Sequence, residues 1–303
     1  MTASGTLLPV PSSDTATVVV EPPGEGPGYW VGAPSAALAD DGTFWLAYRL
    51  RRPFGVGRGY ANVVARSDDG EHFEAVLVLY REDFVCDSLE RPALVRLPEG
   101  SWRLYLSCAT PGTKHWRVDA LDADDPSSFT PASTRTVLPG DDTVGVKDPV
   151  VKVVDGRWHL WLCCHPLDHP DDTDRMSTHY GTSVDGLGWT MHGEAMAGTV
   201  GRWDQRGARV ADVVRHGSEW RAYYDGRPDK ESNAEEHTGM AVGDTPQRLV
   251  AAPERFGAGV DGARSLRYVS AVTLPDGGIR LYYETSRRDG AHDLRTEYVP
   301  PAR

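Results

Sequence analysis

Carboxylates and basic residues stand beside prolines at the start of short apolar segments of this chain. The clearest cases are Glu90-Arg91-Pro92 and Lys147-Asp148-Pro149. Cleavage of a glycosidic bond needs two carboxyl groups, one that donates a proton and one that acts as base or nucleophile. The residues predicted to be catalytic are Asp148, Glu90, Asp225 and Glu236, and the other carboxylates considered are Asp87, Glu235 and Glu284.

Three basic residues, Arg91, Lys147 and Arg209, fall at such segment starts, although the chain as a whole is acidic. A positively charged cleft would attract an anionic ligand and hold it through bidentate Arg contacts. The same cations could instead pair with Glu90 and Asp148 and lower their pKa values. Both interpretations stay open. The residues predicted to bind a ligand are Arg91, Lys147, Arg209, Tyr268, His115, His165, Tyr60 and Arg58.

A glycine-rich stretch at 54–60, FGVGRGY, superficially resembles a nucleotide-binding loop. No helical pattern follows that could offer its N-terminus to a phosphate, so we expect a loop at the rim of a cleft instead. Trp30, Trp116 and Trp203 could stack on sugar rings, or they could pack within the core. No HExxH or paired-histidine spacing occurs, and no metal ligand is predicted.

One sequence motif that could position these residues occurs five times along the chain. Each copy has an apolar strand, a turn with glycine and a second strand ending in aromatic residues: PSAALADDGTFWLAY, RPALVRLPEGSWRLYL, DPVVKVVDGRWHLWL, ARVADVVRHGSEWRAYY and YVSAVTLPDGGIRLYY. The matching aromatic residues are Tyr48, Tyr105, Trp161, Tyr223 and Tyr282, at intervals of 57, 56, 62 and 59 residues. Turns such as Asp41-Gly42 and Asp155-Gly156 suit tight antiparallel hairpins.

A third strand, such as YANVVARS or HYGTSVDG, follows each hairpin. Three to four antiparallel strands repeated radially form propeller blades. Two β-sandwiches would not repeat one sequence motif at a near-constant period. We predict an all-β protein, a five-bladed β-propeller forming a single domain over 1–303. Its blades are predicted to start near residues 33, 91, 148, 208 and 268. The stretch Thr15 to Glu21 could close the ring by pairing with the last blade.

The strand openings, above all VKDPVVKVVDGRWHLWL, resemble those of five-bladed propeller glycosidases of the arabinanase, xylosidase and invertase types. The resemblance implies that Asp148 stabilises the transition state or tunes the acid, and that Glu90 is the general acid. It also implies no cofactor beyond a possible structural cation on the axis. One departure is that the first blade, where such enzymes carry a catalytic Asp, reads Gly32-Ala33-Pro34.

Composition narrows the class of partner. The net charge of −12 disfavours nucleic acid, which is bound by clustered Lys and Arg. No apolar run reaches the roughly 20 residues of a membrane helix, and the N-terminus MTASGTLLPV lacks the pattern of a signal peptide. We therefore expect a cytoplasmic protein without a membrane partner. Its four cysteines, Cys86, Cys108, Cys163 and Cys164, are expected to be reduced core residues.

These observations lead to a ranked set of hypotheses. The first is a glycosidase, a hydrolase that acts on a small glycoside or oligosaccharide in the axial cleft, with an anionic sugar as one option for the substrate. The alternatives are a non-catalytic carbohydrate-binding propeller and a non-hydrolytic enzyme, such as a transferase, lyase or phosphorylase, on the same scaffold. Fold does not decide among them, because one fold hosts many functions.

Overall fold

The computed structural model describes residues 8–12, 15–256 and 265–301, and the predicted 1–303 domain extends beyond them. The described residues are almost entirely strand and turn, which confirms the predicted all-β class. The described helices are three short 3-10 turns: η1 (Arg81–Phe84), η2 (Pro126–Ser128) and η3 (Pro131–Ser133). No described helix is long and apolar enough to cross a lipid bilayer.

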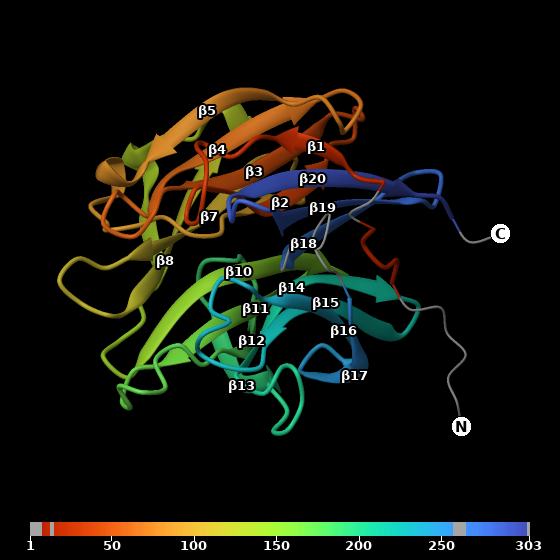
Figure 1. Cartoon of the computed structure of the whole chain (residues 1–303). Coiled ribbons are helices and arrows are strands. Elements are labelled where there is room, and N and C mark those ends of the chain that lie inside the picture. The colour runs from red at the N-terminus through yellow and green to blue at the C-terminus, as the bar shows by residue number, and fades with distance from the viewer. Residues whose placement is uncertain (1–7, 13–14, 257–264, 302–303) are drawn as a thin grey trace.

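The strands form successive antiparallel groups, which Figure 1 shows arranged around a common centre. The first group is β2 (Trp30–Leu38), β3 (Phe44–Arg51), β4 (Gly59–Ser67) and β5 (Glu74–Tyr80). The second is β6 (Ala93–Arg96), β7 (Trp102–Ala109), β8 (Trp116–Ala123) and β9 (Arg135–Leu138). The third is β10 (Val144–Val154), β11 (Arg157–Pro166), β12 (Ser177–Ser183) and β13 (Thr190–Ala197).

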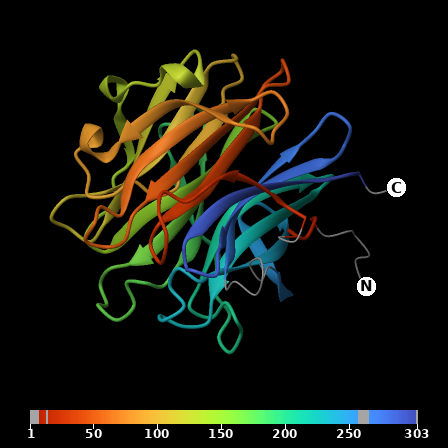
Figure 2. The same cartoon turned by 45° about the horizontal axis from the view of Figure 1, so that its top comes forward.

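The fourth group is β14 (Gly207–His216), β15 (Glu219–Arg227), β16 (His237–Thr245) and β17 (Arg248–Phe256). The last is β18 (Leu266–Thr273), β19 (Ile279–Ser286) and β20 (His292–Val299), to which β1 (Thr17–Val20) adds antiparallel. Single parallel pairs, His237 with Leu266 and Trp30 with His292, join three of the groups into one twelve-stranded sheet. In the tilted view of Figure 2 the first and last groups, red-orange and blue, lie side by side.

Each group begins with one of the predicted hairpins, and all of these hairpins are present. Their tight turns follow from local chemistry. At the β10–β11 turn, for example, Asp155 has φ 51° and Gly156 has φ 74°. Positive φ at both central residues matches the right-handed twist of the flanking strands.

Clusters of buried apolar side chains lie between successive groups. Trp45 of β3 packs with Leu104 of β7, and Trp161 of β11 packs with Trp220 of β15. The last group packs back on the first through residues such as Tyr282. In this packing the first strands of the groups lie next to one another at the centre: β2, β6, β10, β14 and β18. The four cysteines are free and buried.

Candidate functional site

The first strands of three groups, β2, β10 and β18, enter the centre through an irregular backbone. The register shifts just after Gly32 in β2, Lys147 in β10 and Arg267 in β18. The next residue has a left-handed backbone in each case, at Ala33, Asp148 and Tyr268, with φ of 50°, 51° and 57°. A bulge of this kind re-aims side chains. In β18 two neighbouring side chains, Arg267 and Tyr268, thereby line the same central cavity.

A cleft lies at this centre and consists of two adjoining cavities of about 260 Å³ and about 370 Å³. Both cavities are lined by Arg58, Trp116, Lys147, His165, Arg227 and Asn233. The smaller one is also lined by Trp30, Arg49, Arg51, Glu90, Arg209, Glu236, Arg267 and Tyr268. The larger one also reaches Asp87 and His115.

Glu90 is one of the two carboxylates that line the smaller cavity. It forms ion pairs with Arg49 and, at 3.5 Å, with Arg51, and it accepts a hydrogen bond of 3.2 Å from the Ser88 hydroxyl. Burial by itself would raise the pKa of Glu90, but the cations Arg49, Arg51 and Lys147 outweigh it and hold this pKa well below the ordinary range. Glu90 is therefore ionised at neutral pH.

Glu236 is the second carboxylate of this cavity. It accepts a hydrogen bond of 3.0 Å from Arg227 and forms an ion pair with Arg267. Burial opposes ionisation, yet Arg267, Arg209 and Arg227 lower the pKa of Glu236 well below its usual value. Both cavity carboxylates thus carry charge and are held by arginines.

Asp148 and Asp225 lie one layer deeper, fully buried, and do not line the cleft. Arg209 bridges them, with N–H groups 3.2 Å from Asp148 and 2.9 Å from Asp225. The Tyr268 hydroxyl lies 3.4 Å from Asp148, and the Tyr268 backbone N–H donates to Asp225 at 3.1 Å. Burial raises the pKa of Asp225, an effect that Arg209 partly offsets. These two carboxylates fix Arg209 and Tyr268 in place.

The space next to Gly32, where a first-blade carboxylate is absent, is occupied by Glu284 of β19. A Cβ atom on Gly32 would lie 2.4 Å from the Glu284 Oε2 atom. Glu284 is fully buried and accepts hydrogen bonds from Arg267 at 2.7 Å and from the Ala33 backbone N–H at 3.1 Å. It also contacts the His292 ring nitrogen at 2.6 Å. Glu284 anchors the arginines and does not line the cleft.

Cations stack on the aromatic residues of the cleft. Arg209 lies 3.8 Å from the centre of the Tyr268 ring, and Arg51 lies 4.5 Å from that of Trp30. Such contacts add to the burial of the ring and orient it. The aromatic faces at the cleft wall are thus set by charged neighbours.

His165 supplies an uncharged acceptor to the cleft wall. Its Nδ1 donates to the Thr173 carbonyl oxygen at 3.1 Å, since a carbonyl can only accept. Burial, with Lys147 and Arg227 nearby, lowers the pKa of His165 well below its ordinary value, so the ring is neutral and Nε2 is an acceptor. The Cys163 sulfur lies 3.6 Å from Nε2. Burial raises the pKa of Cys163 to about 12, which keeps it a thiol.

The structure brings most of the predicted site residues to this one cleft. Those that line it are Glu90, Glu236, Lys147, Arg209, Tyr268, His115, His165 and Arg58. Arg91 does not line it, because its guanidinium donates to the Pro34 carbonyl at 3.1 Å. Tyr60 does not either, and its ring lies under Arg52 at 4.0 Å. Trp203 stacks on Tyr224 at 5.5 Å, outside the cleft.

Four arginines of the cleft were not among the predicted site residues: Arg49, Arg51, Arg227 and Arg267. A signal for two of them exists in the hairpin register. Arg49 and Arg267 lie within cross-strand pairs at the axial end, Gly32 with Arg49 and Arg267 with Glu284. Arg227 ends β15, next to the polar loop that carries Glu236.

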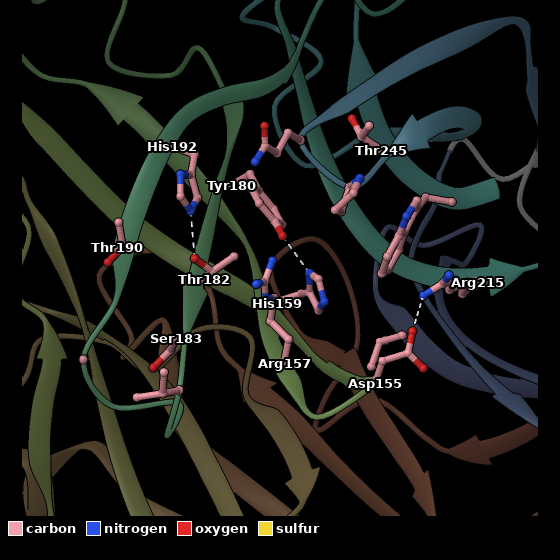
Figure 3. A pocket seen from close by; sticks show the side chains of 16 residues that line it. Asp155, Arg157, His159, Tyr180, Thr182, Ser183, Thr190, His192, Arg215 and Thr245 are labelled. Carbon is pink, nitrogen blue, oxygen red and sulfur yellow. Dashed lines mark hydrogen bonds and ion pairs between the residues drawn. The ribbon is translucent and has the colours of Figure 1, made fainter. Parts of the chain in front are cut away.

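A larger cavity of about 830 Å³ lies elsewhere, between the third and fourth groups (Figure 3). His159 and the Tyr180 hydroxyl form a 2.6 Å hydrogen bond at its floor, and Arg215 pairs with Asp155 at 2.6 Å on its rim. Asp155 is the single carboxylate among its described lining residues. A reaction that needs two carboxyl groups is therefore better served by the axial cleft.

The fold has counterparts among solved structures. A putative glycoside hydrolase from Parabacteroides distasonis matches with 14% identity over 95% of both chains and a TM-score of 0.65. An alpha-L-arabinofuranosidase from Lactobacillus brevis matches with 11% identity, over 88% of this chain and 89% of that one, and a TM-score of 0.66. An N-acetylgalactosamine deacetylase from F. plautii matches with 12% identity, over 93% and 94%, and a TM-score of 0.67.

This chain shares the propeller-like fold of glycoside-hydrolase-like proteins. The resemblance predicted from the strand openings is confirmed at the level of fold. No family model matches the sequence, and no curated protein matches it either. At these identities the likeness concerns the backbone alone. The chemistry depends on the residues that line the cleft.

Proposed function

We propose that this protein is a carbohydrate-active enzyme that binds a small glycoside or oligosaccharide in the axial cleft and cleaves its glycosidic bond. The observation that carries the proposal is that two carboxylates from different groups, Glu90 and Glu236, line one cavity together with Trp30 and Trp116. Aromatic faces suit sugar rings, and paired carboxylates suit glycosidic chemistry. The fold shared with a glycoside hydrolase and an arabinofuranosidase supports the same class of substrate.

In this proposal Glu90 and Glu236 act as ionised groups. Their negative charge would stabilise the positive charge that develops on the sugar in an oxocarbenium-like transition state, and one of them would act as base or nucleophile. The general-acid role that the resemblance implies for Glu90 does not fit its ion pairs with Arg49 and Arg51. Asp148 and Asp225 would act through Arg209 and Tyr268, as positioning residues.

A second candidate is a non-hydrolytic enzyme or a carbohydrate-binding protein on the same scaffold. It is favoured by the protonation states of the carboxyl groups that line the cleft. Among the described residues that line the smaller cavity, both carboxyl groups have lowered pKa values. A glycoside with a poor leaving group needs a proton donor, whereas a transfer with an anionic leaving group does not.

The architecture that we propose for this function is a single five-bladed propeller. Its support is the succession of strand groups and the packing of the last group on the first. The antiparallel pairing of β1 with β20 would then close the ring. Closure by a strand from the other end of the chain leaves no open sheet edge at the junction.

A hydrolysis screen tests the function directly. Purified wild type would be incubated with aryl pyranosides, furanosides and uronides, beside Glu236→Gln, Asp148→Asn and the control His192→Ala from the larger cavity. We expect turnover that falls at least about a hundredfold in Glu236→Gln and is retained in the control. No turnover of any glycoside, with a sugar still raising the melting temperature, would favour the second candidate.

A further inference from the structure

The axial cavity holds more positive than negative charge. Seven cationic side chains line it: Arg49, Arg51, Arg58, Lys147, Arg209, Arg227 and Arg267. Of the residues that the structure describes, two carboxylates line it with them, Glu90 and Glu236. Three buried carboxylates contact these cations from behind: Asp148, Asp225 and Glu284. Asp174 also lies 3.6 Å from Arg227, but its closer partner is Arg206, at 2.6 Å, so this pair adds no net charge. Seven cations against five carboxylates leave a surplus of two positive charges. The surplus is local, because the whole chain has a net charge of −12.

The surplus is concentrated at Arg58 and Lys147. Arg58 has no ion pair within the part of the chain that the structure describes, and the Lys147 ammonium reaches a carboxylate only at 4.0 Å, at Asp148. Both cations instead lie against one indole, with Arg58 5.3 Å and Lys147 5.2 Å from the centre of the Trp116 ring. Neither charge is neutralised by a close partner.

Arg227 completes this side of the cleft. It is 1% exposed, and its guanidinium is held by Glu236 at 3.0 Å and by the Asn233 side chain at 2.8 Å. Its Nε–H has no hydrogen-bond partner among the described residues, and the same holds for the Nε–H of Arg58. A buried donor without an acceptor is costly, and a bound oxyanion would supply that acceptor.

We propose that the ligand of the axial cleft is a sugar that carries an oxyanion group, bound by Arg58, Lys147 and Arg227. These three residues come from different strand groups and line both adjoining cavities. The inference rests on the proposed function for its sugar part and on the charge of the cleft for its anionic part. A cationic cleft in an acidic protein concentrates field lines and draws anions to this one place.

The surroundings of the three cations fit a sugar rather than a bare ion. Trp116 offers a ring face beside Arg58 and Lys147. The Nε2 acceptor of the neutral His165 is met only by the Cys163 thiol, a weak donor that a sugar hydroxyl group can replace. The shared chemistry is an oxyanion, which a phosphorylated sugar and a sugar acid both supply. The surplus of two charges favours the dianion of a phosphate ester, and the test separates the two sources.

Calorimetric titration tests the proposal without any need for turnover. The probes are glucose 6-phosphate, glucuronate, unmodified glucose and inorganic phosphate, each at low and at high salt. The variants are Lys147→Met and Arg58→Met, which remove a charge but keep much of the side-chain volume. The matched control is Arg215→Met, which removes a charge from the larger cavity.

We expect the anionic probes to bind, glucose to bind far more weakly, and salt to weaken only the anions. Lys147→Met and Arg58→Met should each weaken binding by about tenfold to a hundredfold, and Arg215→Met should leave it unchanged. Tighter binding of glucose 6-phosphate assigns a phosphate ester, and tighter binding of glucuronate assigns a carboxylate.

Other results overturn the proposal. These are equal affinity for glucose, wild-type affinity in both cleft variants, loss of affinity only in Arg215→Met, or no binding of any anion, inorganic phosphate included. Binding of anionic sugars without any glycoside turnover would remove the proposed hydrolytic function and leave this inference standing. Turnover of neutral glycosides that Lys147→Met does not affect would support the hydrolytic function and overturn this inference.

Discussion

At the scale of single residues, the cleft is organised by arginines that each serve two carboxylates. Arg209 joins Asp148 to Asp225, and Arg267 joins Glu236 to Glu284. Buried ion pairs are costly to desolvate, and removing one partner leaves an unpaired charge. The network therefore fixes side-chain positions more than it adds stability, and cleft residues are expected to respond strongly to single substitutions.

Restoring a carboxylate at the first strand should fail for steric reasons. Gly32→Asp would place a Cβ atom 2.4 Å from Glu284 Oε2 and 2.5 Å from Glu284 Cβ. We expect the free energy of unfolding to fall by about 2–4 kcal/mol, with no gain in glycoside turnover. Adding Glu284→Gly makes room for the new carboxylate and should recover part of the loss, as a double-mutant cycle by urea unfolding would measure. Strictly additive losses would contradict this account.

His165 should make the stability depend on pH. Its pKa is lowered in the folded state by burial and by Lys147 and Arg227, while the unfolded chain has the ordinary value of 6.5. Between these two values the unfolded chain binds more protons, so the free energy of unfolding decreases as pH falls below 6.5. In His165→Asn, whose amide N–H can still donate to Thr173, this slope should shrink by up to about 1.4 kcal/mol per pH unit. Urea unfolding across this range gives the slopes, and equal slopes in both proteins would refute the assignment.

At the scale of elements, the hairpins depend on backbone conformations that few residues adopt. Gly156 has φ 74° in the β10–β11 turn, and a Cβ atom there would meet nothing within 4 Å. Gly156→Ala therefore tests backbone strain alone and should lower the free energy of unfolding by about 1 kcal/mol. Gly188, without a positive φ and equally open, is the matched control. Gly188→Ala should be neutral or slightly stabilising by thermal unfolding, and equal effects of the two changes would rule out backbone strain as the cause.

At the scale of the whole molecule, the ends of the chain meet where β1 pairs with β20. Val19 of β1 is half-buried against the cluster that contains Val31 and Tyr282, whereas Thr17 of the same strand is exposed. Placing a charge on the packed face should detach the strand and expose the edge of β20.

Val19→Asp should therefore lower the free energy of unfolding by about 1–3 kcal/mol and promote aggregation, whereas Thr17→Asp should do neither. Urea unfolding and light scattering on the two variants measure this. Similar behaviour of both variants would show that β1 contributes little to the stability of the ring.

The all-β class and the hairpins follow from the amino-acid sequence alone, because strand alternation and turn residues act over a few positions. The sequence repeat also predicts that Glu90, Lys147, Arg209 and Tyr268 share one cleft, since a repeated motif puts equivalent residues at equivalent places. Arg91 stands at such a place and yet turns to the Pro34 carbonyl. The repeat determines the position of a residue along its strand, and the packing around that residue determines where its side chain points.

Which carboxylates line the cleft, and in which charge state, depends on the tertiary structure. Asp148 lies within β10 rather than at its start, and a left-handed backbone turns it beneath Tyr268. Glu284 from a distant strand fills the space beside Gly32. The pairing of Glu90 with Arg49 joins residues 41 positions apart. Charge state depends on burial and on neighbours within a few ångströms, and these neighbours are far apart along the chain.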